Sequence, residues 1–88
     1  MGKDIPHIDK LTPETGPKSG DNSVVITGSY FLDVTKVLFG DNRVDDFTSS
    51  SDGKRIDVHK VPKGAAAGQV DVVVWTDHAS NAKPYTYE

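Results

Sequence analysis

The sequence predicts an all-β domain built as a sandwich or a barrel, and three observations lead to this prediction. Strand-forming stretches recur about every ten residues along the 88-residue chain, and turn-forming residues separate them. Several stretches alternate between apolar and polar residues, which is typical of strands with one buried face. No helical segment lies between them, since the alanines at 65–67 are too few to nucleate a helix between two glycines.

About seven short strands are expected, in chain order at 5–11, 23–27, 36–40, 43–47, 55–59, 69–76 and 84–87. Pro6 places the first strand at a sheet edge, because proline has no N–H to donate to a central ladder. The second strand is rich in β-branched residues, which favour a pleated, half-buried surface. Gly28 is expected to end this strand at a bulge or a positive φ.

The later strands follow from turn residues and from alternation. The third strand runs into Gly40 and the turn-forming pair Asp41 and Asn42. In the fifth strand Ile56 and Val58 alternate with charged residues, so both are expected to face the core. The connections are rich in Pro, Gly, Ser or Asn and are expected to be turns and loops at 12–22, 30–35, 48–53, 62–68 and 77–83.

Alternation also predicts the core, which is expected to lie between two sheets packed face to face. Phe31 and Phe47 are expected to close its ends. The expected inward-facing residues are Val24, Ile26, Val37, Phe39, Ile56, Val58, Val70, Val72, Val74 and Tyr85.

Composition limits the classes of function. A net charge of −3 argues against the basic surface that nucleic-acid binding requires. No apolar run approaches about 18 residues, so no membrane insertion is expected, and no apolar stretch after Met1 suggests a signal peptide. The chain has no cysteine, which by itself favours the cytosol, although a well-packed sandwich outside the cell needs no disulfide. The length fits one domain, residues 1–88.

Metal binding is weakly indicated. The histidines, His7, His59 and His78, have no partner at the spacing of metal ligands, so no metal site is expected there. The turn residues Asp41, Asn42, Asp45 and Asp46 carry oxygen ligands that could hold calcium. They lack the order of a known calcium loop, and Asp and Asn also serve turns through their own hydrogen bonds.

Catalysis and cofactor binding are not expected. Ser49, Ser50 and Ser51 lie beside Asp52, but no glycine-flanked nucleophile elbow is present. A polar surface turn cannot preorganise an oxyanion hole, and no Gly-rich phosphate loop occurs. The densest basic group is expected to be a solvated face; it comprises Lys54, Arg55, Lys60 and Lys63.

The chain resembles the IPT/TIG domain, an immunoglobulin-like (E-set type) β-sandwich, through an ordered set of motifs over nearly its whole length. The run 24–31 ends in Thr-Gly and a distal Phe, and 37–40 has the form Val-x-Phe-Gly. Residues 8–20 resemble the opening strand with its Pro- and Gly-rich turn. The remaining matches are Ile56, Val61-Pro62, Gly64, Gly68, 70–76 and 85–87.

The resemblance implies an accessory role rather than a catalytic one. Such modules act as spacers or docking units in bacterial surface proteins, secreted carbohydrate-active enzymes, phage virion proteins and receptor ectodomains, and some in transcription factors contact DNA. We therefore expect a non-catalytic module in an extracellular, cell-surface or virion protein, whose partner is a neighbouring domain or another copy of itself. The alternatives are a carbohydrate-binding module, with Trp75 and a tyrosine stacking on a glycan, and a DNA-contacting module, which the charge disfavours.

Alternation also predicts a docking face. If Val37 and Phe39 point inward, Leu38 points outward, and the same argument turns Val73 and Trp75 outward. With the final strand at the sheet edge, these side chains and Thr86 are expected to share one outer surface. Trp75 could instead fold over the edge and cover Pro84 or Tyr87.

Overall fold

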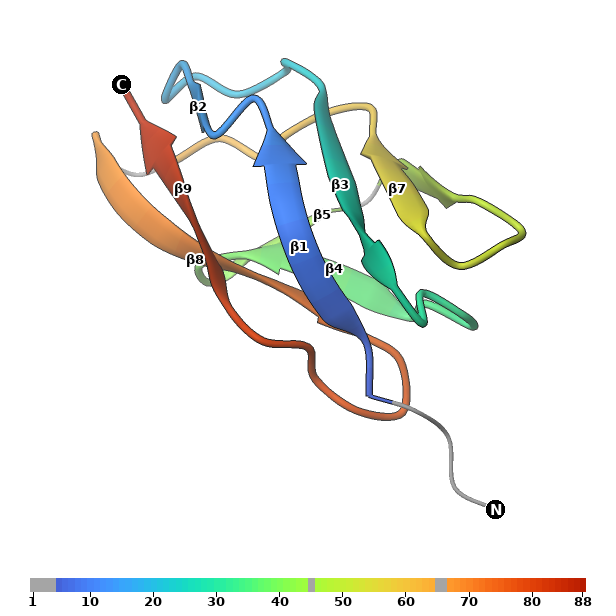
Figure 1. The fold of residues 1–88 in the computed structure, drawn as a ribbon. Coiled ribbons are helices and arrows are strands. Elements are labelled where there is room, and N and C mark those ends of the chain that lie inside the picture. The colour runs from blue at the N-terminus through green and yellow to red at the C-terminus, as the bar shows by residue number, and fades with distance from the viewer. Residues whose placement is uncertain (1–4, 45, 65–66) are drawn as a thin grey trace.

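The computed structural model describes residues 5–44, 46–64 and 67–88, which form two facing β-sheets (Figure 1). No helix occurs in these ranges, so the predicted all-β sandwich is confirmed. The four-stranded sheet has the order β1 (His7–Thr12), β3 (Val24–Ser29), β7 (Arg55–Val58) and β6 (Phe47–Ser49). The five-stranded sheet has the order β2 (Thr15–Gly16), β9 (Lys83–Tyr87), β8 (Gly68–Trp75), β4 (Lys36–Phe39) and β5 (Asn42–Val44).

The structure has nine strands instead of about seven, and both extra strands are short. The stretch expected as one strand at 43–47 contributes to β5 and β6, which belong to different sheets. The expected turn at 12–22 contains β2, which pairs in parallel with β9. The sequence predicts the final strand at the sheet edge. This prediction is wrong, because β2 lies at the edge and β9 lies between β2 and β8. Gly16 permits this pairing, because a Cβ there would collide with the Tyr85 hydroxyl.

Gly28 has a different role from the expected one. It does not end the strand, since β3 continues to Ser29, and its φ is not positive. A Cβ on Gly28 would collide with the carbonyl oxygen of His7 on the neighbouring β1. The β1–β3 pairing shifts register between Ile8 and Lys10, so an irregularity lies at this point, on the partner strand. Glycine is required here by the close approach of two backbones.

The core lies between the sheets and largely matches the prediction. Phe31 and nine of the ten residues expected to face inward are buried; Val70 and Phe47 are only half-buried. Val70 lies where β8 extends past the end of β4, and Phe47 lies on the edge strand β6, so each lacks cover on one side. The core also contains residues that were not on the predicted inner faces: Ile8, Leu11, Val44, Val61 and Tyr87.

The two ends of the sandwich differ in what they carry. The described chain enters at the start of β1 and leaves at the end of β9, at the opposite end (Figure 1). The connection from β3 to β4 lies at the entry end, whereas β8 starts at the exit end (Figure 1). Within the described ranges no helix could traverse a lipid bilayer.

Candidate docking face

The outer surface of the five-stranded sheet carries a row of apolar side chains. Leu38 on β4 lies directly opposite Val73 on β8 in the strand register. Val37 and Val72 beside them are fully buried, so Leu38 and Val73 point to the other side of the sheet. Both are half-buried, so this side of the sheet is partly open to solvent. The structure thus brings two of the expected docking residues into direct cross-strand contact range.

Trp75 extends this row by one step along β8. It lies opposite Lys36 of β4, and the Lys36 Nζ is 5.0 Å from the centroid of the indole ring. This is the geometry of a cation–π contact, which places the charge over the ring face. One face of the Trp75 ring is therefore occupied by a side chain of the same molecule. Sequence reasoning missed Lys36, since the contact depends on the cross-strand register.

Thr86 is on the same sheet but away from this group. It lies opposite Gln69, near the start of β8, whereas Trp75 ends that strand. The residues that Trp75 could have covered are also distant in register, since Pro84 lies opposite Asp71 and Tyr87 opposite Gly68. We define the docking face as Leu38, Val73 and Trp75, with Lys36 on its border.

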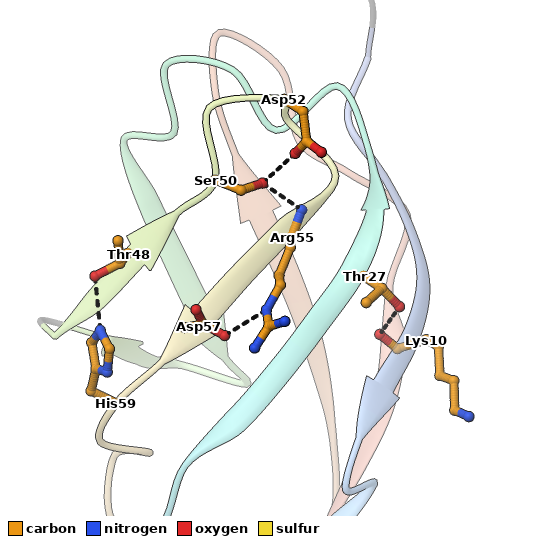
Figure 2. Close-up of polar contacts among 8 residues, drawn as sticks. All are labelled: Lys10, Thr27, Thr48, Ser50, Asp52, Arg55, Asp57 and His59. Carbon is orange, nitrogen blue, oxygen red and sulfur yellow. Dashed lines mark hydrogen bonds and ion pairs between the residues drawn. The ribbon is translucent and has the colours of Figure 1, made fainter.

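The four-stranded sheet carries several pairs of polar side chains that contact one another (Figure 2). Along β7 the Arg55 Nε lies 2.9 Å from the Asp57 carboxylate. The Thr48 hydroxyl and the His59 Nε2 are 2.8 Å apart, and the Thr27 hydroxyl donates to the Lys10 carbonyl at 3.4 Å (Figure 2). Polar groups on this surface are thus already paired with one another, which is typical of a solvated face.

The serine-rich turn between β6 and β7 forms a braced loop. The Ser50 hydroxyl donates to Asp52 at 2.6 Å (Figure 2). The backbone N–H of Lys54 donates to the same oxygen at 3.1 Å. These bonds stabilise the carboxylate and hold the pKa of Asp52 below its usual value. The nearest histidine along the chain, His59, is hydrogen-bonded to Thr48 through its Nε2.

The structure separates the other candidate residues. His7 lies 3.2 Å from Asp9, and the backbone N–H of His78 bonds to Thr76. Across the described ranges no three His, Asp or Glu side chains gather in a way that could hold a metal ion. Of the possible calcium ligands, Asp41 lies in the β4–β5 turn, Asn42 begins β5, Asp46 precedes β6, and Asp45 is outside the described residues.

The basic residues do not share one face. Arg55 is paired with Asp57 on the four-stranded sheet, and Lys54 lies in the β6–β7 connection. Lys60 and Lys63 line a small cavity of about 170 Å³ together with Arg43, Asp21 and Asp46. This mixture of charges differs from the continuous basic surface typical of nucleic-acid binding.

A larger cavity lies at the exit end, beside the start of β8. It has a volume of about 760 Å³, and its walls include Val70 and Val73 together with Asp41 and Asp71. We call this cavity the hollow. Sequence reasoning missed it, because its walls come from the β4–β5 turn, the segment before β8 and β8 itself.

Comparison with known families agrees with this architecture. The family model described as "IPT/TIG domain" matches residues 6–88. The chain belongs to this family. A search of curated protein sequences gives no match for this IPT/TIG domain.

Solved structures share the fold of this IPT/TIG domain at low sequence identity. The TIG domain of human nuclear factor of activated T-cells, cytoplasmic 4, superimposes with a TM-score of 0.76 at 20% identity, covering 94% of this chain and 87% of that one. SGBP-B from a complex xyloglucan utilization locus in Bacteroides uniformis gives a TM-score of 0.73 at 20% identity over 94% of this chain. Gamma-CGTase from alkalophilic Bacillus clarkii gives a TM-score of 0.75 at 24% identity over 94% of this chain. This chain spans 23% of the SGBP-B chain and 12% of the CGTase chain, so it corresponds to one part of each.

Proposed function

We propose that this IPT/TIG domain is a non-catalytic accessory module that acts as a spacer or docking unit within a larger protein. The observation that carries the proposal is the contrast between the two outer surfaces. Leu38, Val73 and Trp75 form an apolar row on one sheet, whereas the other sheet presents paired polar groups. Apolar surface with a tryptophan at its end is typical of protein contact sites.

The proposal places the whole chain, residues 1–88, in one module of an extracellular, cell-surface or virion protein. Support comes from the family match over 6–88 and from the small share of SGBP-B and of the CGTase that the chain covers. The partner of the docking face is then the neighbouring domain of the full-length protein. In such a module the sandwich needs no reactive group, and its rigidity sets the distance between the parts it joins.

The test compares Trp75→Ala with Thr86→Ala, a truncation on the same sheet that leaves the docking face untouched. We expect Trp75→Ala to keep the fold and to weaken binding of the neighbouring domain by about 2 kcal/mol or more, as truncations at binding hot spots do. Thr86→Ala should leave the binding free energy within about 0.5 kcal/mol of the wild-type value. The measurements are the melting temperature and the affinity from calorimetry. A sharp fall in melting temperature with unchanged affinity would assign Trp75 to the core and remove the docking face.

The alternative function is carbohydrate binding, which the similarity to a protein from a xyloglucan utilization locus favours. A sugar would have to stack on Trp75, and Lys36 occupies one face of that ring. Titration with a xylogluco-oligosaccharide separates the two functions. Binding that Trp75→Ala abolishes and Lys36→Ala improves would support the carbohydrate role over protein docking.

A further inference from the structure

The exposed large apolar side chains of the described residues gather at the entry end. They are Ile5, Tyr30 and Leu32, which are 61%, 50% and 53% exposed. Tyr30 and Leu32 belong to the connection between β3 and β4, close to the end of β3. Ile5 lies two residues before His7, which pairs with Ser29 next to Tyr30. We call Ile5, Tyr30 and Leu32 the entry patch.

The connection that carries Tyr30 and Leu32 is held in an unusual conformation. Tyr30 has a φ of 60°, in the left-handed region that non-glycine residues rarely adopt. Between the two exposed residues the Phe31 side chain is buried, and its backbone N–H donates to the Gly53 carbonyl at 2.8 Å. Leu32 lies against Gly53, where a Cβ would come within 2.9 Å of its Cδ2. Phe31 therefore anchors the connection, and the exposure of its two neighbours is built into the fold.

The charged side chains beside the entry patch have both signs. Asp33 follows Leu32, while Asp52 and Lys54 lie on either side of Gly53, and all three charged side chains are exposed. Charge of one sign therefore does not select the partner of this patch. An apolar centre with a mixed polar border is typical of contacts between protein surfaces.

The size of the entry patch decides which kind of partner it suits. Three side chains that are each about half exposed offer on the order of 300 Å² of surface. A stable complex between separate molecules usually needs about 800 Å² on each partner. Contacts between domains of one chain begin near a total of about 600 Å², or about 300 Å² on each side. The linker makes such a small contact sufficient, because it keeps the two domains at a high effective concentration. The patch is therefore too small for a free partner or a second copy and suits a domain of the same chain.

The path of the chain decides which domain can reach the patch. Ile5 is itself part of the patch, and the described chain enters at this end (Figure 1). A domain that precedes this module is joined to it through Ile5, and a linker of about ten residues spans at most about 35 Å. A domain that follows is joined beyond Glu88, at the opposite end (Figure 1). The preceding domain is therefore the one that its linker holds next to the patch.

We propose that the entry patch packs against the domain that precedes residues 1–88 in the full-length protein, so that the two domains form one rigid unit. The inference rests on the proposed role as a module of a larger protein, and it names the part of that protein that contacts this end. Tyr30 and Leu32 would pack into the surface of the preceding domain, and Ile5 would fix the direction in which the chain arrives. The docking face and the hollow are separate surfaces.

The first experiment measures how fast hydroxyl radicals oxidise individual side chains. It compares the full-length protein with a truncated protein that begins at Met1. We expect Tyr30 and Leu32 to be oxidised severalfold more slowly in the full-length protein, because the preceding domain covers them. His59 is exposed beyond the end of β7 and is the internal control, which should be oxidised equally in both proteins.

The second experiment removes the apolar side chains from the full-length protein. The double variant is Tyr30→Asn/Leu32→Ser, in which Asn is chosen because it adopts the left-handed region more readily than other residues. This variant should have a larger radius of gyration by small-angle scattering, and a protease should cut the linker before Ile5 severalfold faster. Lys60→Ser/Lys63→Ser removes two exposed side chains from the β7–β8 connection and should change neither quantity.

Four results would overturn the proposal. The first is a full-length protein in which no folded domain precedes this module, and the second is equal oxidation of Tyr30 and Leu32 with and without that domain. The third is protection that arises in the truncated protein as its concentration rises, which would assign the patch to a second copy. The fourth is a double variant whose scattering and cleavage match those of the wild type.

The oxidation experiment uses the wild-type sequence, so it decides the proposal even if the double variant folds poorly. None of the four results would alter the effect of Trp75→Ala on binding at the docking face. Failure of the contact at the entry end is therefore distinguishable from failure of the docking role.

Discussion

The side-chain amide of Asn81 makes two hydrogen bonds to the backbone of Ile8. Its Oδ1 accepts from the Ile8 N–H at 2.7 Å, and its Nδ2 donates to the Ile8 carbonyl at 3.1 Å. Ile8 belongs to the four-stranded sheet, whereas Asn81 lies in the connection between β8 and β9 of the five-stranded sheet. One side chain therefore continues the hydrogen bonding of β1 and joins the two sheets at the entry end.

Asn81→Ala should lower the free energy of unfolding by about 1–3 kcal/mol, because it leaves two partly buried backbone groups without their partner. Chemical denaturation measures the change. Gln69→Ala, an amide truncation at an exposed position of β8, should cost less than about 0.5 kcal/mol. If the two variants have equal stability, water replaces Asn81 without cost and the amide does not hold the sheets together.

Phe39→Ala should lower the free energy of unfolding by about 3–5 kcal/mol. Phe39 is fully buried and meets the Tyr85 ring edge to face, with centroids 5.0 Å apart and an interplanar angle of 76°. Its neighbour Leu38 points outward, so Leu38→Ala is the control and should cost clearly less. Thermal and chemical unfolding measure both variants. If Phe39→Ala and Leu38→Ala lose equal stability, the assignment of Phe39 to the inner face of β4 and Leu38 to the outer face is wrong.

Gly28→Ala should destabilise the domain by about 1–3 kcal/mol or more. The added Cβ would meet the His7 carbonyl oxygen, and a backbone atom cannot rotate away as a side chain can. Ser29→Ala changes the next residue without adding an atom to this contact and serves as the comparison. A Gly28→Ala variant as stable as the wild type would show that β1 separates from β3 at this point without cost.

Tyr87 should make stability fall in alkaline solution. Burial, together with the nearby Tyr85, raises the pKa of Tyr87 above its usual value near 10, and its hydroxyl donates to the Pro62 carbonyl at 2.8 Å. The neutral phenol is therefore favoured by folding. The contribution of this neutral phenol to the free energy of unfolding is complete below about pH 10. It is lost as the pH rises through the higher pKa of Tyr87 in the folded state. Denaturation between about pH 8 and 11.5 should show a shallower loss for Tyr87→Phe than for the wild type. Tyr30→Phe, at an exposed position, should follow the wild type; a Tyr87→Phe variant with the wild-type slope would assign the alkaline loss to other groups.

Strands whose side chains alternate were predictable, because a period of two determines which face each residue occupies. Val37 and Phe39 turn inward and Leu38 outward as expected, and the same holds for 72–75. Pairing through the backbone was not predictable: β2 has only two residues and no side-chain pattern. The cover of Trp75 by Lys36 depends on which residues face each other across β4 and β8, and the sequence carries no direct record of that register. The exposure of Tyr30 and Leu32 depends on backbone angles that local propensity does not predict for these residues.

The parallel pairing of β2 with β9 also determines how the domain responds to force. The Thr86 N–H donates to the Glu14 carbonyl at 2.9 Å, the Glu88 N–H to Gly16 at 2.8 Å and the Lys18 N–H to Glu88 at 3.3 Å. A pull that separates the entry and exit ends slides the last strand along the segment 14–18. These bonds then carry the load together and must break together, instead of opening one after another. Under tension the rate of unfolding governs survival, so these bonds are expected to slow unfolding when the domain is pulled in this direction.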